Sequence, residues 1–412
     1  MPVQQERKQS LRDELTKEHI APAVDMPSAK APKVPQAQAN LQQAQPNVMA
    51  LDSSKHKEEL AKFLKLGLKA FSEGREFESL SNIEKLDALV YAMRDEDYFA
   101  IKYVRHTAPT MPQTVEETFS SKQGDCDELS RVYVALAKKL GITNLTQCFV
   151  SFRNTETGEH EGHAALFFVD GQVLYADPGF EKAYPFDKKY TSIEEAKKDP
   201  EFLAQLAKWQ GETRGGTWVV DETTVMKNPL ALEGAYNLES STYALAQGNW
   251  DKAKEEAKSA VDKGVECSLA YFNLGQAYYQ LDDFSNAIPN LEKAVERKKT
   301  DPRYYAILGD SYSRNDQHVA AADAFRNQIK LHPENNDAKF DLVDELKITG
   351  KSAMHSESYA DAVKCYGEAE KILSGIFTNK SSTDADKAAS EALLPEVKQN
   401  LQKARQKNLS NE

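Results

Sequence analysis

A step of 34 residues recurs in the C-terminal half of the chain and constrains its fold more than any other feature of the sequence. The residues that recur at this step are Leu274, Gly275 and Tyr278 with Leu308, Gly309 and Tyr312, and Ala287 with Ala321. The same step taken backwards pairs Trp250 with Phe284 and Ala253 with Ala287. Self-similarity at a fixed period of this length is typical of repeat architectures, in which each unit packs only on its neighbours. We therefore expect a stack of like units in this half of the chain.

The recurrence resembles the tetratricopeptide repeat (TPR), which places small residues where paired helices approach closely and large ones between neighbouring helices. The resemblance implies an all-α TPR solenoid at residues 233–373, with about four repeats. The expected repeats are 234–267, 268–301 and 302–335, and then Asn336 to about Leu373 after an insertion of seven residues near Thr349 to Ser356. Residues 374–412 are expected to hold a polar capping helix, Asp386 to Lys407, and a tail.

A TPR array implies a concave groove for a protein or peptide partner, and Asn273 is expected at a groove-facing position. The alternative is that the repeats only brace the rest of the chain or form a dimer, because repeat arrays have no obligatory ligand.

Cys126 stands at the predicted start of an amphipathic helix that ends before Gly141. Asp125 is a good N-cap, and Glu128 three residues later completes the spacing of a capping box. The unpaired N–H groups of a first helical turn stabilise a thiolate at Cys126. The negative charges of Asp125, Asp127 and Glu128 oppose that effect, so a nucleophilic Cys126 needs a histidine partner.

Two histidines, His160 and His163, follow Cys126 in the chain. His160 lies between glycine and glutamate residues in a segment expected to be a loop, with a gating or substrate contact as its alternative role. His163 opens a predicted strand at residues 164–169, which makes it the preferred partner of Cys126.

A second predicted strand, residues 172–176, runs up to Asp177 and forms a hairpin with the first. A two-residue loop at Asp170-Gly171 pairs Asp177 with Ala164 and excludes a direct contact between Asp177 and His163. A three-residue loop with Gly171 in the left-handed conformation sets Asp177 opposite His163. The catalytic hypothesis therefore predicts an odd-numbered loop here, or an equivalent bulge.

These motifs together resemble the transglutaminase-like superfamily of papain-related cysteine enzymes. The resemblance covers about Val115 to Gly179 and is carried by Gly124-Asp125-Cys126-Asp127-Glu128-Leu129, Gly162-His163-Ala164 and Asp177-Pro178. It implies an α+β papain-like core in which Cys126 is the nucleophile, His163 the general base and acid, and Asp177 the orienting carboxylate. The family often has an aromatic residue where this chain has Ala165, which leaves the shape of the substrate groove open.

The resemblance implies a cysteine hydrolase, a protease or amidase that cleaves peptide or isopeptide amides through a thioester, while the TPR repeats recruit a protein substrate or partner. Two alternatives are an inactive transglutaminase-like/TPR scaffold for protein assembly and a protein cross-linking acyltransferase. We expect no cofactor and no metal, because the four cysteines form no CxxC pair and the chain has no calcium-loop pattern. The cysteines are expected to be free thiols.

The charge balance argues against a nucleic-acid partner. The chain of 412 residues has 52 Lys and Arg against 64 Asp and Glu, a formal net charge of -12, whereas nucleic-acid binders need clustered positive charge. No apolar run approaches the length of a membrane helix, and no apolar segment typical of a secretory signal follows the start, so a cytoplasmic protein is expected.

Two further segments complete the expected organisation. Residues 1–52 are expected to form a disordered or tethering tail: the first 20 or so could form a charged helix, and Ala21 to Ala50 are rich in Pro, Ala and Gln with little apolar periodicity. Residues 53–232 are expected to hold a helical lead-in and the transglutaminase-like domain.

Overall fold

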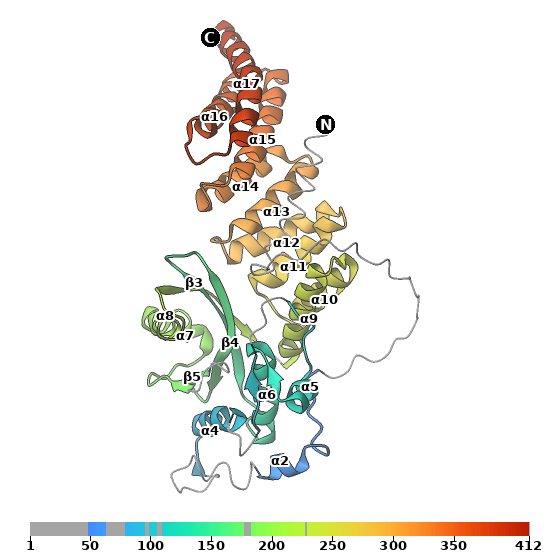
Figure 1. Ribbon diagram of the computed structural model, residues 1–412, viewed down its shortest axis with the longest axis vertical. Helices are drawn as coiled ribbons and strands as arrows, with labels where there is room; N and C mark the ends of the chain where they lie inside the picture. The colour runs from blue at the N-terminus through green and yellow to red at the C-terminus, as the bar shows by residue number, and fades with distance from the viewer. Residues whose placement is uncertain are drawn as a thin grey trace, which may run out of the picture. The chain divides into compact units, whose positions relative to one another are not determined.

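The computed structural model describes residues 48–62, 79–94, 99–104, 109–176, 183–226 and 229–411 of the chain (Figure 1). The chain divides into two compact units, Met1–Ala270 and Tyr271–Glu412. Most of the predicted tail lies outside the described residues. Its last part is packed, because Leu51 is buried and the carbonyl oxygen of Val48 accepts a hydrogen bond of 3.0 Å from the N–H of Val115.

The N-terminal unit combines helices with a five-stranded sheet. Its described helices are α2 (Lys57–Lys62), α4 (Asn82–Arg94), α5 (Val115–Ser121), α6 (Cys126–Lys139), α7 (Ile193–Ala196), α8 (Pro200–Arg214), α9 (Pro229–Ala246) and α10 (Trp250–Asp262). Its described strands are β1 (Lys102–Tyr103), β2 (Gln123–Gly124), β3 (Thr146–Asn154), β4 (His160–Val169), β5 (Gln172–Ala176), β6 (Ala183–Pro185) and β7 (Trp218–Met226). The strand order in the sheet is β6-β5-β4-β3-β7, with antiparallel neighbours, and β1 pairs with β2 in parallel.

Helices cover both faces of this sheet (Figure 1). Phe167, Val169 and Leu174 are buried in one apolar core with residues of α4, α5 and α6. Leu166 and Val173, their neighbours in sequence, are buried in a second core with residues of α7 and α8. Because successive side chains of a strand point to opposite faces, this alternation places β4 and β5 between two helical layers.

A two-residue turn joins β4 to β5. Asp170 and Gly171 both have positive φ, 52° and 80°, and Val169 pairs with Gln172. Asp-Gly is the sequence that this hairpin turn prefers, because both central residues must adopt positive φ. The odd-numbered loop that the catalytic hypothesis called for is therefore wrong at this position.

The N-terminal unit extends further than the predicted domain end at residue 232. Ala231 and Leu232 of α9, together with Ala260 of α10, are buried in the same apolar core as Val132 of α6. Burial of apolar surface is the main favourable term in packing, so the first helical pair joins the unit whose core it completes.

The C-terminal unit consists of antiparallel helices. They are α11 (Ser268–Gln280), which begins before the boundary, α12 (Phe284–Arg297), α13 (Pro302–Arg314), α14 (His318–Leu331), α15 (Asn336–His355), α16 (Tyr359–Thr378) and α17 (Asp384–Asn411). Helices α15 and α16 have 20 residues each, against 13 or 14 in α11 to α14. The insertion expected near Thr349 to Ser356 falls in the last turns of α15. The final helix α17 lies where a capping helix is expected.

Glycines permit close helix packing in this unit. A Cβ atom added to Gly275 would lie 2.6 Å from Cγ of Leu291, and one added to Gly309 would lie 2.6 Å from the ring of Phe325. The recurring glycine is thus a contact point between paired helices. Asn273, expected to face a groove, is fully buried instead.

Candidate functional site

Cys126 is the first residue of α6 and is half-buried. Asp125 has the extended backbone of an N-cap, and its Oδ1 accepts hydrogen bonds of 3.0 Å from the N–H groups of Asp127 and Glu128. Oε2 of Glu128 accepts a hydrogen bond of 3.0 Å from the N–H of Asp125, which completes the capping box. The predicted helix start is confirmed, with Cys126 at the first helical position.

The backbone on the other side of Cys126 is also fixed. The N–H of Val104 donates to the carbonyl oxygen of Gly124 at 2.9 Å, and β1 and β2 pair beside it. A Cβ atom at Gly124 would lie 2.7 Å from Cγ2 of Thr118 and 3.1 Å from Cβ of Glu128. Only glycine fits this approach without displacing its neighbours, so a short glycine link seats α6 against α5.

Carboxylates surround the helix start. Burial raises the pKa of Asp127 well above its ordinary value, and the negative charges of Glu239 and Asp125 add to the shift. Burial also raises the pKa of Glu128, again with a contribution from Asp125. Burial is thus the main cause of both shifts, and the charge of Asp125 adds to each.

A buried arginine, which sequence reasoning did not single out, balances part of this charge. Arg131 is 2% exposed, and both terminal nitrogens of its guanidinium donate to the carboxylate of Glu239 in α9. Nη2 of Arg131 also donates to the carbonyl oxygen of Gln113 at 3.1 Å, and the N–H of Gln113 donates to Oε1 of Glu128 at 2.8 Å. Gln113 therefore links the capping box to the ion pair.

The ionisation of this ion pair is unusual. Burial raises the pKa of Glu239 to about 7, although Arg131 acts in the opposite direction. Burial lowers the pKa of Arg131, but the charge and hydrogen bonds of Glu239 have the larger effect, so the arginine pKa is raised overall. A charged residue inside the apolar run of α6 was a visible signal for Arg131. Glu239 gave none, because its partner lies 108 residues away in the chain.

The backbone of β4 contains an irregularity between Leu166 and His163. Cys148 of β3 pairs with Leu166 of β4, and Val150 of β3 pairs with His163 of β4. The two pairs are two residues apart along β3 but three residues apart along β4. One strand therefore carries an extra residue, which defines a β-bulge at Ala164 and Ala165. The catalytic hypothesis allowed such a bulge in place of an odd-numbered loop.

The described part of the chain places the predicted triad only in part. Cys126 is fully described, and His163 is described as a backbone position in β4. The side chains of His160 and His163, and the whole of Asp177, lie outside the described residues.

Three potential metal ligands meet at the same helix start. The ligand atoms of Asp125, Cys126 and Asp127 lie within 4.8 Å of one another. They come from consecutive residues, and Asp125 already accepts two hydrogen bonds of the cap. The cap itself accounts for this grouping.

Comparison with known proteins identifies the repeats. Residues 238–302 match the family model of the tetratricopeptide repeat. Similar solved structures include the Arabidopsis OM64 TPR domain, with 22% identity over 28% of this chain and 96% of that chain at a TM-score of 0.27. A second is YrrB, described as a TPR protein with an unusual peptide-binding site, with 18% identity over 44% of this chain and 89% of that chain at a TM-score of 0.28. A third is MamA, with 22% identity over 42% of this chain and 91% of that chain at a TM-score of 0.30. Comparison with curated proteins gives no match.

The matched range runs from α9 to the start of α13 and does not include Cys126, His163 or Asp177. Among the described helices, none is long and apolar enough to cross a membrane. The chain contains tetratricopeptide repeats, which are modules for protein–protein interaction.

Proposed function

We propose that the chain is a transglutaminase-like cysteine hydrolase of peptide or isopeptide amides, with Cys126, His163 and Asp177 as its triad. In this proposal the TPR repeats recruit the protein substrate or an assembly partner. The observation that carries the proposal is the position of Cys126, a half-buried thiol in the first turn of a helix whose start is fixed by a complete capping box.

The chemistry follows from that position. His163 takes the thiol proton, and Sγ of Cys126 attacks the amide carbonyl to form a tetrahedral adduct. The N–H of Cys126 is a candidate donor to the resulting oxyanion. His163 then protonates the leaving amine as the C–N bond breaks, which leaves a thioester on Cys126. Water, deprotonated by His163, attacks the thioester, releases the acid and restores the thiol.

The bulge in β4 supports the assignment of His163 and Asp177. The proposal requires Asp177 opposite His163, and a regular ladder continued from the two-residue turn would offset them by one residue. An extra residue lies between Leu166 and His163 in the pairing of β4 with β3, and the same extra residue carried into the pairing with β5 would give the odd count that the triad needs.

A second candidate function, an inactive scaffold, is favoured by the charges around the thiol. The carboxyl groups of Asp125, Asp127, Glu128 and Glu239 interact with one another at this helix start, whereas a typical reactive thiol has cationic neighbours. In a scaffold the same helix start would have only a structural role.

Covalent labelling separates the two functions. The full chain is incubated with a peptide probe that carries a thiol-reactive vinyl sulfone in place of the scissile amide, and the labelled peptide is identified by mass spectrometry. A hydrolase gives labelling at Cys126 that is lost in His163→Ala and strongly reduced in Asp177→Asn. The matched control is Cys365→Ala, which removes another half-buried thiol and leaves the labelling unchanged.

A scaffold gives no preference for Cys126 over Cys365, and that result would contradict the proposal. If the unlabelled enzyme instead couples a fluorescent primary amine to a glutamine-containing protein faster than it hydrolyses the glutamine amide, the activity is cross-linking transfer rather than hydrolysis.

A further inference from the structure

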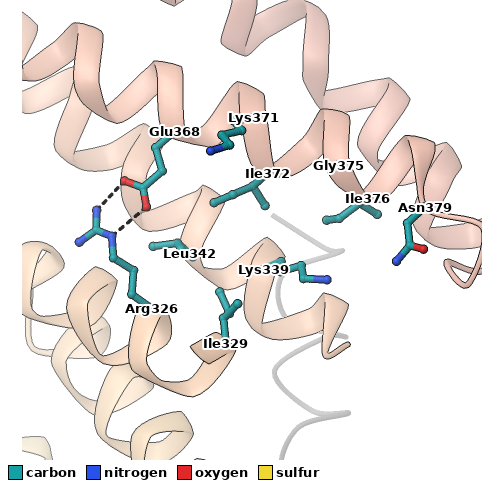
Figure 2. Close-up of a pocket in the computed structure, with 10 residues that line it drawn as sticks. All are labelled: Arg326, Ile329, Lys339, Leu342, Glu368, Lys371, Ile372, Gly375, Ile376 and Asn379. Carbon is teal, nitrogen blue, oxygen red and sulfur yellow. Dashed lines mark hydrogen bonds and ion pairs between the residues drawn. The ribbon is translucent and has the colours of Figure 1, made fainter. Parts of the chain in front are cut away.

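The C-terminal unit contains a cavity of about 520 Å³ between α14, α15 and α16 (Figure 2). This volume lies within the range of sites that hold a small molecule or the anchoring side chain of a peptide. The lining residues all lie after residue 302, where the family-model match ends. The cavity therefore belongs to the last two helical pairs, which include the lengthened α15 and α16.

The floor of the cavity is apolar. Ile329 of α14, Leu342 of α15 and Ile372 of α16 line it from three different helices (Figure 2). Leu342 is 2% exposed, whereas Ile329 and Ile372 are only half-buried. Covering these two side chains would remove further apolar surface from water, which favours an apolar group of a ligand in this space.

The charges around the floor are positive on balance. Arg326 and Glu368 neutralise each other through two hydrogen bonds of 2.8 Å, Nε to Oε1 and Nη2 to Oε2. Lys371 is exposed, and Lys339 donates to the neutral amide oxygen of Asn336 at 3.0 Å. Among the lining residues two lysine charges thus remain, on a chain with a net charge of -12, while Asp323 outside the lining also pairs with Arg326.

We propose that this cavity binds an acidic peptide segment of a partner protein, which inserts one large apolar side chain between Ile329 and Ile372. Carboxylates beside the inserted side chain then pair with Lys339 and Lys371, because opposite charges at an interface steer association and fix the register of the partner. The cavity is lined by α14 and α16, the second helices of their pairs, together with Lys339 and Leu342 of α15, the first helix of its pair. The site therefore differs from a groove lined by first helices alone, and its ligand does not depend on the activity of Cys126.

Gly375 provides a direct way to close the cavity. It lines the cavity from α16, and a Cβ atom built on it meets no atom within 4 Å. A leucine at this position extends into the open space without backbone strain, and it favours the helix by about 1 kcal/mol relative to glycine. Gly367 in the same helix is the matched control, because its Cβ also meets open space and it does not line the cavity.

The test measures peptide binding to the full chain by fluorescence anisotropy. The probe is a short fluorescein-labelled peptide with Leu-Phe at its centre and two glutamates on each side. We expect Gly375→Leu to weaken binding at least about tenfold, and Gly367→Leu to leave it unchanged. The double variant Lys339→Glu/Lys371→Glu is expected to weaken binding by a similar factor, while Lys398→Glu/Lys403→Glu in α17 has the same change in net charge and no effect.

Several outcomes overturn the proposal. One is that the acidic peptide does not bind at about 1 mM. Another is that a peptide with lysines in place of the glutamates, or with alanines in place of Leu-Phe, binds as tightly as the original peptide. Binding that survives Gly375→Leu places the peptide elsewhere on the chain. If sedimentation shows that the protein self-associates and Gly375→Leu abolishes this, the occupant is a second copy of the chain. The measurement is independent of thiol labelling, so either proposal can fail alone.

Discussion

Arg131 of α6 and Glu239 of α9 form a buried bidentate ion pair, with Nη2 of the arginine 3.1 Å from Oε2 of the glutamate. The pair joins the helix that begins at Cys126 to the helix that opens the TPR region. The first repeat is thereby part of the unit that holds the candidate catalytic thiol.

Breaking this pair from one side is expected to destabilise the N-terminal unit. Arg131→Met leaves Glu239, Asp127 and Glu128 without their buried counter-charge, and loss of one partner of a buried pair typically costs about 3–5 kcal/mol. All three tryptophans lie in residues 1–270, so tryptophan fluorescence during urea unfolding reports on this unit. The double variant Arg131→Met/Glu239→Leu should lose less than Arg131→Met alone. If the free energy of unfolding of Arg131→Met lies within about 0.5 kcal/mol of the wild-type value, the ion pair does not contribute measurably to stability.

The titration of Glu239 should make the stability of the folded chain depend on pH. Its pKa is raised from 4.5 to about 7 in the folded chain, so the folded state holds the proton more tightly than the unfolded state. The stability from this group is fully present below about pH 4.5 and is lost as the pH rises through about 7. We expect the free energy of unfolding to fall over this window, and Glu239→Gln to remove much of the fall. An unchanged slope in Glu239→Gln would assign the pH dependence to other groups.

Asp125 both caps α6 and places a negative charge beside Cys126, and two substitutions separate these effects. Asp125→Asn keeps an oxygen that accepts the hydrogen bonds of Asp127 and Glu128 but removes one negative charge beside Cys126. We expect a drop of about half to one unit in the thiol pKa, and faster alkylation of Cys126 near neutral pH. Asp125→Ala also removes the cap and should lower stability by about 1 kcal/mol. Slower alkylation in Asp125→Asn would mean that the carboxylate itself activates the thiol.

The recurring glycine gives a matched test of packing in the C-terminal unit. A methyl group at Gly309 meets the buried ring of Phe325, so Gly309→Ala should lower stability by about 1–2 kcal/mol. Gly367→Ala enters open space within a helix and should raise stability by up to about 1 kcal/mol. Hydrogen exchange of residues 271–411 measures both. Equal effects of the two variants would refute the close-packing role of Gly309.

Local rules account for what the sequence predicts correctly. The start of α6 follows from the chemistry of Asp125 and Glu128, which need only neighbouring N–H groups to form the cap. The helical pairs follow from small residues at fixed spacing, as at Gly309. The two-residue turn also obeys a local rule, the preference of Asp170-Gly171 for positive φ, and of the two forms that the catalytic hypothesis allowed, this turn excludes the odd-numbered loop and leaves the bulge.

Features that depend on distant contacts were not predictable in this way. The bulge in β4 is defined by pairing with β3, and nothing in the Ala164-Ala165 sequence marks it. The ion pair of Arg131 with Glu239 and the inclusion of α9 in the N-terminal unit depend on packing between segments far apart in sequence. The buried position of Asn273 likewise follows from its neighbours rather than from its residue type.

The most direct test of the account is the pH profile of Cys126 alkylation by iodoacetamide, measured residue by residue by mass spectrometry. Cys365 serves as an internal reference, because burial raises its pKa. We expect alkylation of Cys126 to reach half its maximal rate below about pH 7, and His163→Ala to move this midpoint to about pH 8.5, the pKa of an unassisted thiol. A wild-type midpoint at or above about pH 8.5 that His163→Ala does not change would contradict the cysteine hydrolase and leave the scaffold as the function of this unit.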